Sequence, residues 1–118
     1  MTRYDLIRML VLNEIVDDYE EPAHILERLS ELGHSCGVPV NASDVHSALF
    51  DLVKFRWASA YDLLNGPPKE LKSALRQEDI DRYYYWITPY GCERLSAFEG
   101  WPFDDEGTLI PGWCAPAS

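Results

Sequence analysis

Apolar and polar residues follow two different periods along this chain. Up to about residue 55 the apolar residues recur every three to four positions, which predicts helices over residues 4–19, 22–33 and 43–55. Residues 57–63 and 82–88 are rich in aromatic side chains and predict the two strands of a hairpin. A short fourth helix is predicted over residues 92–98, after a Thr-Pro-Tyr-Gly turn.

Residues with special backbone or capping properties mark the ends of these elements. Pro22 suits the first turn of the second helix, and Gly33 is expected to end it. Asn41 or Ser43 can cap the third helix by accepting from its free N–H groups. Residues 69–77, at the tip of the hairpin, are expected to form one or two helical turns.

Two segments raise the question of what covers their apolar side chains. The first predicted helix is apolar on nearly all sides, so we expect it to cross the core or to lie in a homodimer interface. The last segment, residues 99–118, is acidic and contains Trp101 and Trp113. We therefore divide the chain into a domain, residues 1–98, and a tail, residues 99–118, that packs on the domain or on a partner.

The composition is that of a globular protein. The chain has 118 residues, of which 47% are hydrophobic and 13% aromatic, and disordered chains contain fewer aromatic residues than this. No apolar run reaches the ~18 residues that would cross a bilayer, and no signal peptide is evident. We expect a cytoplasmic protein that does not bind a membrane. The three cysteines form no Cys-x-x-Cys pair, so we expect reduced thiols and no metal site.

Three segments in order give the chain a likeness to a known family. They are AHILERL at residues 23–29, SDVHSALFDLV at 43–53 and YWITPYGCERL at 85–95. In this order, residues 6–98 resemble the winged helix-turn-helix transcriptional regulators, especially the PadR-like and MarR-like groups. The resemblance implies an α+β winged helix: a three-helix core with a two- or three-stranded β-wing, followed by a short C-terminal helix and tail. It also implies a transcriptional regulator that binds double-stranded DNA.

The resemblance assigns DNA contacts to particular residues. The third helix would enter the major groove and the wing would lie on the flanking backbone. The expected contacts are Ser43, His46, Ser47, Lys54, Arg56, Lys69, Lys72 and Arg76. Asp44 and Asp51 are expected on the exposed side of the same helix, where they would repel phosphates.

The net charge of −10 weakens this prediction without removing it. The net charge is −5 over residues 1–32, zero over 41–56, −1 over 57–88 and −4 from residue 89 onward, where Arg94 faces five acids. The acids therefore concentrate away from the expected DNA face. The five lysines and arginines of that face would become about ten in a homodimer, enough for salt-dependent DNA binding. The alternative is that they are ordinary solvated side chains.

Other functions remain open on the sequence alone. A winged helix can serve as a protein–protein interaction module, and an acidic domain can imitate DNA. The module would be favoured if Asp44 and Asp51 bordered an exposed apolar groove, and DNA binding if the cations formed one stripe. The aromatic run of residues 83–86 fits core packing better than base stacking. We find no catalytic motif and expect neither an enzyme nor a cofactor. A small-molecule pocket between the first helix and the tail is a further alternative, but no set of residues identifies a ligand.

Overall fold

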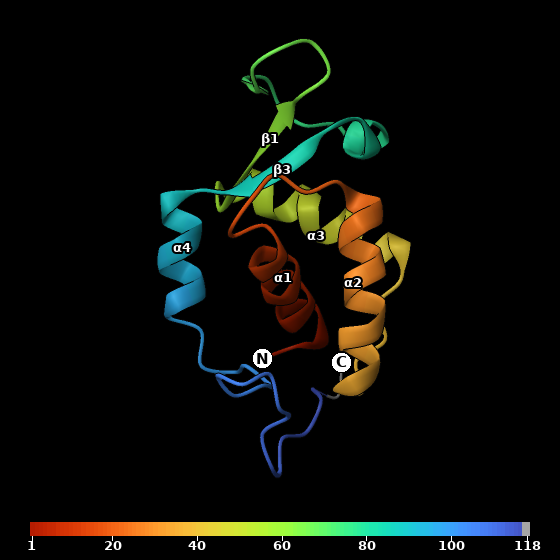
Figure 1. Cartoon of the computed structure of the whole chain (residues 1–118), viewed down its shortest axis with the longest axis vertical. Helices are drawn as coiled ribbons and strands as arrows, with labels where there is room; N and C mark the ends of the chain where they lie inside the picture. The colour runs from red at the N-terminus through yellow and green to blue at the C-terminus, as the bar shows by residue number, and fades with distance from the viewer. Residues whose placement is uncertain (117–118) are drawn as a thin grey trace.

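The computed structural model describes residues 1–116, which form an α+β structure. The elements are α1 (Arg3–Glu14), α2 (Pro22–Ser35), α3 (Ala42–Lys54), β1 (Ala58–Asp62), β2 (Lys69–Glu70), the 3₁₀ helix η1 (Gln77–Arg82), β3 (Tyr84–Ile87) and α4 (Pro89–Ser96). The predicted α+β class is confirmed, and the arrangement is compatible with a winged helix. In Figure 1, α1 lies centrally between α2 and α4, the sheet covers one end and the tail crosses the other.

Helix α1 forms the centre of the core. Six of its residues are buried: Leu6, Ile7, Met9, Leu10, Val11 and Leu12. Its apolar character on nearly all sides is thus accounted for by burial within one chain, between α2, α3 and α4. The choice between the core and a dimer interface is therefore decided for the core, and the homodimer remains a prediction.

The predicted first helix was too long at its C-terminal end, because α1 stops at Glu14. The backbone groups of the following residues form hydrogen bonds with strand β3. The carbonyl of Ile15 accepts from the Ile87 N–H (3.0 Å), and Glu20 pairs with Tyr85 in an isolated antiparallel bridge. These long-range hydrogen bonds replace the helical ones. Two aspartates at residues 17 and 18 would also be unfavourable at the negative end of a longer helix.

Helix α2 runs two residues past the predicted stop at Gly33. Gly33 is needed for close packing rather than for helix termination: a Cβ there would lie 2.3 Å from the carbonyl oxygen of Val38. The glycine that follows the helix is Gly37, with φ at +75°, a conformation that costs glycine little.

Helix α3 has a well-defined N-terminus. Of the two candidate caps it is Asn41 that accepts from the Asp44 N–H (2.9 Å), while the Asp44 carboxylate accepts from the Asn41 N–H (3.0 Å). This reciprocal pair satisfies two N–H groups that the helix itself leaves free. One face of α3 then packs through Val45, Ala48, Leu49 and Leu52 onto the core.

The two predicted arms of the hairpin pair as expected. Strands β1 and β3 are antiparallel, with Ala60 opposite Tyr85, and the sheet order is β2-β1-β3. The prediction of helical turns over residues 69–77 was wrong. Lys69 and Glu70 form β2 on the edge of β1, and the Leu71 N–H donates to the Ala60 carbonyl (2.8 Å). The preceding Pro67-Pro68 favours extended backbone, and the helical turns come later, in η1.

The aromatic run of β3 is used within the chain. Tyr85 is fully buried, and its hydroxyl donates to the Ile80 carbonyl (2.7 Å). On the opposite side Trp86 is half-buried, contacts Tyr19 edge-on and donates from Nε1 to the Val16 carbonyl (3.0 Å). Tyr85 therefore packs in the core, and Trp86 packs edge-on against Tyr19 within the same chain.

Helix α4 starts at Pro89, three residues before the predicted helix. Thr88 caps it by accepting from the Gly91 N–H (3.0 Å), and Pro89 occupies its first turn, where no N–H is needed. Gly91 lies against the chain that enters β1, since a Cβ there would be 2.0 Å from the Trp57 carbonyl oxygen. The Thr-Pro pair was read as a turn, although it is also a helix-start signal.

The tail returns to the body of the structure at Phe103, which is buried, and Trp101 contacts Phe98 edge-on (6.1 Å between ring centroids). The division into residues 1–98 and 99–118 remains a prediction, and residues 117 and 118 lie outside the described part of the chain. Within residues 1–116, no helix has both the length and the apolar content needed to span a membrane.

Candidate nucleic-acid interface

The outward face of α3 carries four residues at helical spacing. Ser43 and Lys54 are exposed, and Ser47 and Phe50 between them are half-buried. Positions 43, 47, 50 and 54 fall on one side of a helix with 3.6 residues per turn. This side combines two hydroxyl groups, one aromatic ring and one cation at the C-terminal end of the helix.

Both acids of α3 are neutralised by arginines of α1. Asp44 was expected to be exposed but is 5% exposed, and it receives a hydrogen bond from Arg3 (3.1 Å) in addition to its role in the helix cap. Asp51 is held by Arg8 through Nε (3.0 Å) and Nη2 (2.7 Å). The repulsion expected from these two carboxylates is therefore largely offset within the chain. Neither borders a large apolar groove, which had been the condition favouring an interaction module.

The predicted contacts in the N-terminal half of α3 do not act as a group. The ring of His46 lies 2.9 Å from Asp81 through Nε2, so it is already partnered by η1. Ser47 lines a shallow depression of about 270 Å³ together with Tyr4 and Gln77. Ser43 is exposed near the N-terminus of the helix and belongs to neither feature.

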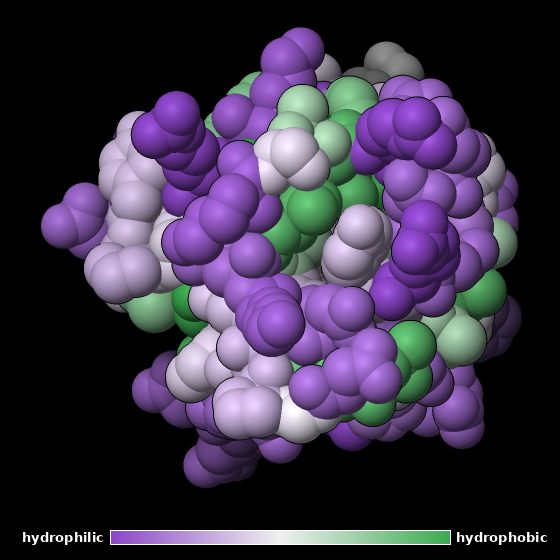
Figure 2. Space-filling model, turned by 90° about the horizontal axis from the view of Figure 1, so that it is seen from above, coloured by the Kyte–Doolittle hydropathy of each residue, from purple (hydrophilic) through white to green (hydrophobic). Residues whose placement is uncertain are grey.

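A groove of about 800 Å³ lies between the C-terminal end of α3, strand β1 and the segment after β2. We call it the α3 groove. Three predicted contacts line it, namely Lys54, Arg56 and Lys72, and Glu70 is its one carboxylate. Most of the other lining residues are apolar: Phe50, Val53, Ala58, Ala60, Leu71, Ala74 and Leu75. Figure 2 views the molecule from the sheet end and shows an apolar hollow surrounded by hydrophilic residues.

Arg56 is held in an unusual backbone conformation at the edge of this groove. Its φ is +65°, which is uncommon for a residue with a side chain, and it is the one such non-glycine position in residues 1–116. The Thr88 hydroxyl donates to the Arg56 carbonyl (2.6 Å), and the Arg56 N–H donates to Val53 (3.0 Å). These bonds fix the turn from α3 into β1 and therefore the backbone position from which the Arg56 side chain extends.

The predicted cations differ in whether they are already paired. Lys72 lies 3.5 Å from Glu70, and Arg76 lies 3.3 Å from Glu78 and 3.2 Å from Asp79. Arg76 does not line the α3 groove. Among residues 1–116, four of the ten lysines and arginines make no ion pair: Lys54, Arg56, Lys69 and Arg94. Two of these four, Lys54 and Arg56, line the α3 groove, and Lys69 lies on strand β2 opposite Asp62.

Sequence reasoning missed three groups that shape this face. Glu70 and Thr88 line the groove, but Glu70 was predicted in the helical turns of residues 69–77 and Thr88 in the last strand and the turn after it. Phe50 was recognised as exposed without being assigned a role. Helical spacing places Phe50 on the same side of α3 as Lys54, but no local signal identifies Glu70 or Thr88, because they reach the groove through strand pairing and chain reversal. No protein-family model matches the chain, and no curated protein or solved structure is significantly similar to it.

Proposed function

We propose that this chain is a winged-helix protein that binds double-stranded DNA and acts as a transcriptional regulator. The order of elements supports the fold proposal: three helices precede an antiparallel hairpin, and the segment between α1 and α2 pairs with β3 through Glu20 and Tyr85. In this proposal α3 enters the major groove, and the segment that follows it lies along the phosphates.

The observation that carries the proposal is the placement of unpaired cations. In a chain of net charge −10, Lys54, Arg56 and Lys69 make no ion pair within residues 1–116: Lys54 and Arg56 lie at the C-terminal end of α3, and Lys69 lies on the wing, in edge strand β2. The acids of the same helix are neutralised from behind by Arg3 and Arg8. The face therefore presents local positive charge to a polyanion despite the acidity of the whole protein.

The number of free cations sets the expected salt dependence. Three phosphate contacts per chain give a slope of about −2.7 for log K against log salt concentration, and two chains about −5.4. Raising salt from about 50 to about 200 mM should weaken binding roughly 40-fold for a monomer and roughly 1,800-fold for a dimer. The slope therefore reports the number of chains bound as well as the type of contact.

The test is fluorescence anisotropy with labelled duplexes of mixed sequence at several salt concentrations. The Lys54→Gln/Lys69→Gln variant should bind more weakly and reduce the slope per chain to about −0.9. The Arg28→Gln/Arg82→Gln variant is a matched control, since it removes the same charge from arginines that are paired elsewhere. Equal losses in both variants, or no binding at the lowest salt with folded protein, would refute the proposal.

A second candidate function is binding of a protein segment in the α3 groove. The observation favouring it is the apolar lining of the groove between its cations, which suits a short amphipathic segment with acidic residues. This candidate predicts no duplex binding at any salt concentration. It also predicts that Leu71→Asp, in the apolar lining, abolishes binding of the protein segment, whereas under the DNA-binding proposal the same variant would weaken duplex binding only moderately.

A further inference from the structure

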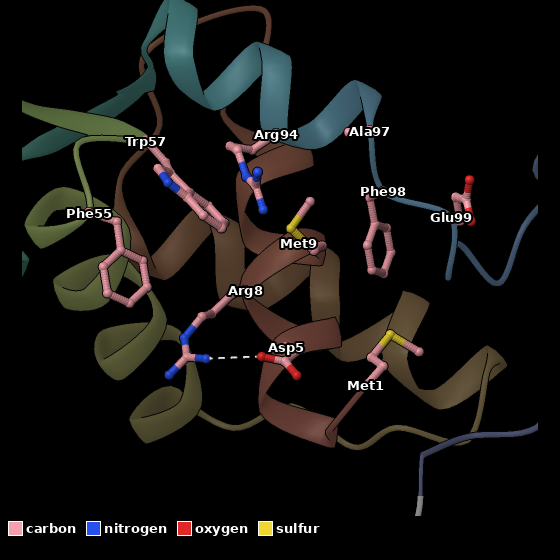
Figure 3. Close-up of a pocket in the computed structure, with 10 residues that line it drawn as sticks. All are labelled: Met1, Asp5, Arg8, Met9, Phe55, Trp57, Arg94, Ala97, Phe98 and Glu99. Carbon is pink, nitrogen blue, oxygen red and sulfur yellow. Dashed lines mark hydrogen bonds and ion pairs between the residues drawn. The ribbon is translucent and has the colours of Figure 1, made fainter.

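A second cavity lies on another side of the turn that carries Arg56. It has a volume of about 560 Å³ and is bounded by α1, by the turn from α3 into β1 and by the C-terminal end of α4. Figure 3 shows its lining, in which Trp57, Met9, Phe98 and Met1 supply the apolar walls. This volume is in the range of pockets for small molecules, about 300–1,000 Å³. We call it the α1–α4 cavity.

One positive charge in this cavity has no counter-charge. Arg94 extends from α4 toward the space between Trp57 and Met9, and its guanidinium carbon lies 5.3 Å from the centroid of the Trp57 ring. No carboxylate of residues 1–116 forms an ion pair with it. The ring covers one side of the guanidinium by a cation–π contact, which leaves its edge as hydrogen-bond donors directed at the cavity.

The other charged groups of the cavity are already engaged or point elsewhere. Asp5 accepts from the Thr2 N–H (2.9 Å) in the cap of α1 and pairs with Arg8 (3.3 Å). Arg8 in turn is held by Asp51 in α3. The carboxylate of Glu99 is directed away from the centre of the cavity in Figure 3. The cavity therefore presents a single unpaired cation, Arg94, in a chain of net charge −10.

The residues that line the walls of the cavity determine which ligand body could be attached to an anionic group. Met1 and Met9 are flexible thioether side chains that adapt to irregular apolar shapes, and Phe98 adds a rigid surface beside them. The side chain of Met1 is 60% exposed, so apolar surface is open to solvent at the mouth of the cavity. A ligand with an apolar chain would cover this surface and would release the water that now contacts it.

From this geometry we infer that the α1–α4 cavity binds a small carboxylate with an apolar chain. The carboxylate accepts hydrogen bonds from Arg94, and the chain packs against the two methionines, Phe98 and Trp57. Charge complementarity selects the anion, and the apolar walls select its body. This inference goes beyond DNA binding and does not depend on it, because the ligand contacts only residues of this cavity.

The test is an NMR titration of ¹⁵N-labelled protein with octanoate. The probe signal is the indole N–H of Trp57, assigned by its absence in Trp57→Phe, and the indole of Trp86 on the sheet is the internal control. Octanoate should shift the Trp57 signal saturably. Octanamide, which has the same chain without the charge, should bind about tenfold or more weakly. Hexanoate should bind about fifteenfold more weakly, because two methylene groups fewer are buried.

A pair of variants distinguishes a specific contact with Arg94 from a general effect of the protein's charge. Arg94→Gln should weaken octanoate binding about tenfold or more, while Arg82→Gln, which removes an exposed arginine on η1, should leave it unchanged. The comparison of octanoate with octanamide uses only the wild-type protein, so it remains a valid test even if Arg94→Gln folds poorly. Equal affinity for octanoate and octanamide, or no saturable Trp57 shift below the micelle-forming concentration of octanoate, would overturn the inference.

Discussion

The buried hydroxyl of Tyr85 offers a sharp test of how the sheet is joined to the rest of the fold. The side chain is fully buried, and its hydroxyl donates to the carbonyl of Ile80 at 2.7 Å. The backbone of the same residue pairs with Glu20 in both directions, at 2.9 and 3.0 Å. Tyr85 therefore ties together β3, η1 and the segment between α1 and α2. Tyr85→Phe removes the hydroxyl and leaves the ring in place.

The expected cost follows from the burial of the partner. The Ile80 carbonyl would lose the hydrogen bond from that hydroxyl, and a buried polar group left unsatisfied costs about 1–3 kcal/mol. For a chain of this length, about 1 kcal/mol corresponds to roughly 4 °C in the melting temperature. We therefore expect Tyr85→Phe to melt roughly 4–12 °C below the wild type.

Tyr84 provides a matched control one residue away. It is half-buried on the opposite side of β3, and its hydroxyl makes no hydrogen bond within residues 1–116. Tyr84→Phe should change the free energy of unfolding by less than about 0.5 kcal/mol. The measurement is urea denaturation of both variants followed by circular dichroism. Equal stability of the two variants would show that the Tyr85 hydrogen bond does not hold η1 on the sheet.

Three further predictions concern the fold and its pH dependence. Gly91→Ala would place a Cβ 2.0 Å from the Trp57 carbonyl oxygen, so it should cost more than about 2 kcal/mol by urea denaturation, because backbone atoms must move. Asp44→Ala removes the carboxylate that accepts from the Asn41 N–H in the α3 capping box and that pairs with Arg3, and we expect a loss of about 2–4 kcal/mol by the same assay. Burial raises the pKa of Tyr85, so its contribution to stability is complete below about pH 10 and is lost as pH rises further. Between pH 9 and 11 the free energy of unfolding should therefore fall by about 1.4 kcal/mol less in Tyr85→Phe than in the wild type.

The sequence by itself determined the features that depend on neighbouring residues. The period of apolar residues predicted three helices before a hairpin, and the structure has them in that order. Asn41 and Ser43 were the two predicted caps of the third helix, because either side chain reaches N–H groups only a few residues away, and the structure uses Asn41. The aromatic residues of 82–88 predicted a strand, and in β3 Tyr85 and Trp86 lie on opposite sides because successive strand residues point to opposite faces.

Tertiary contacts decided everything that depends on residues far apart in the chain. The end of α1 is set by hydrogen bonds to β3, some seventy residues later, and β2 forms where helical turns were predicted because β1 offers it an edge. Asp44 and Asp51 are neutralised by arginines of α1, at separations of 41 and 43 residues. The candidate site follows the same rule. Composition could count its cations, but only packing determines which are paired, because an ion pair depends on distance in space and not on spacing in sequence.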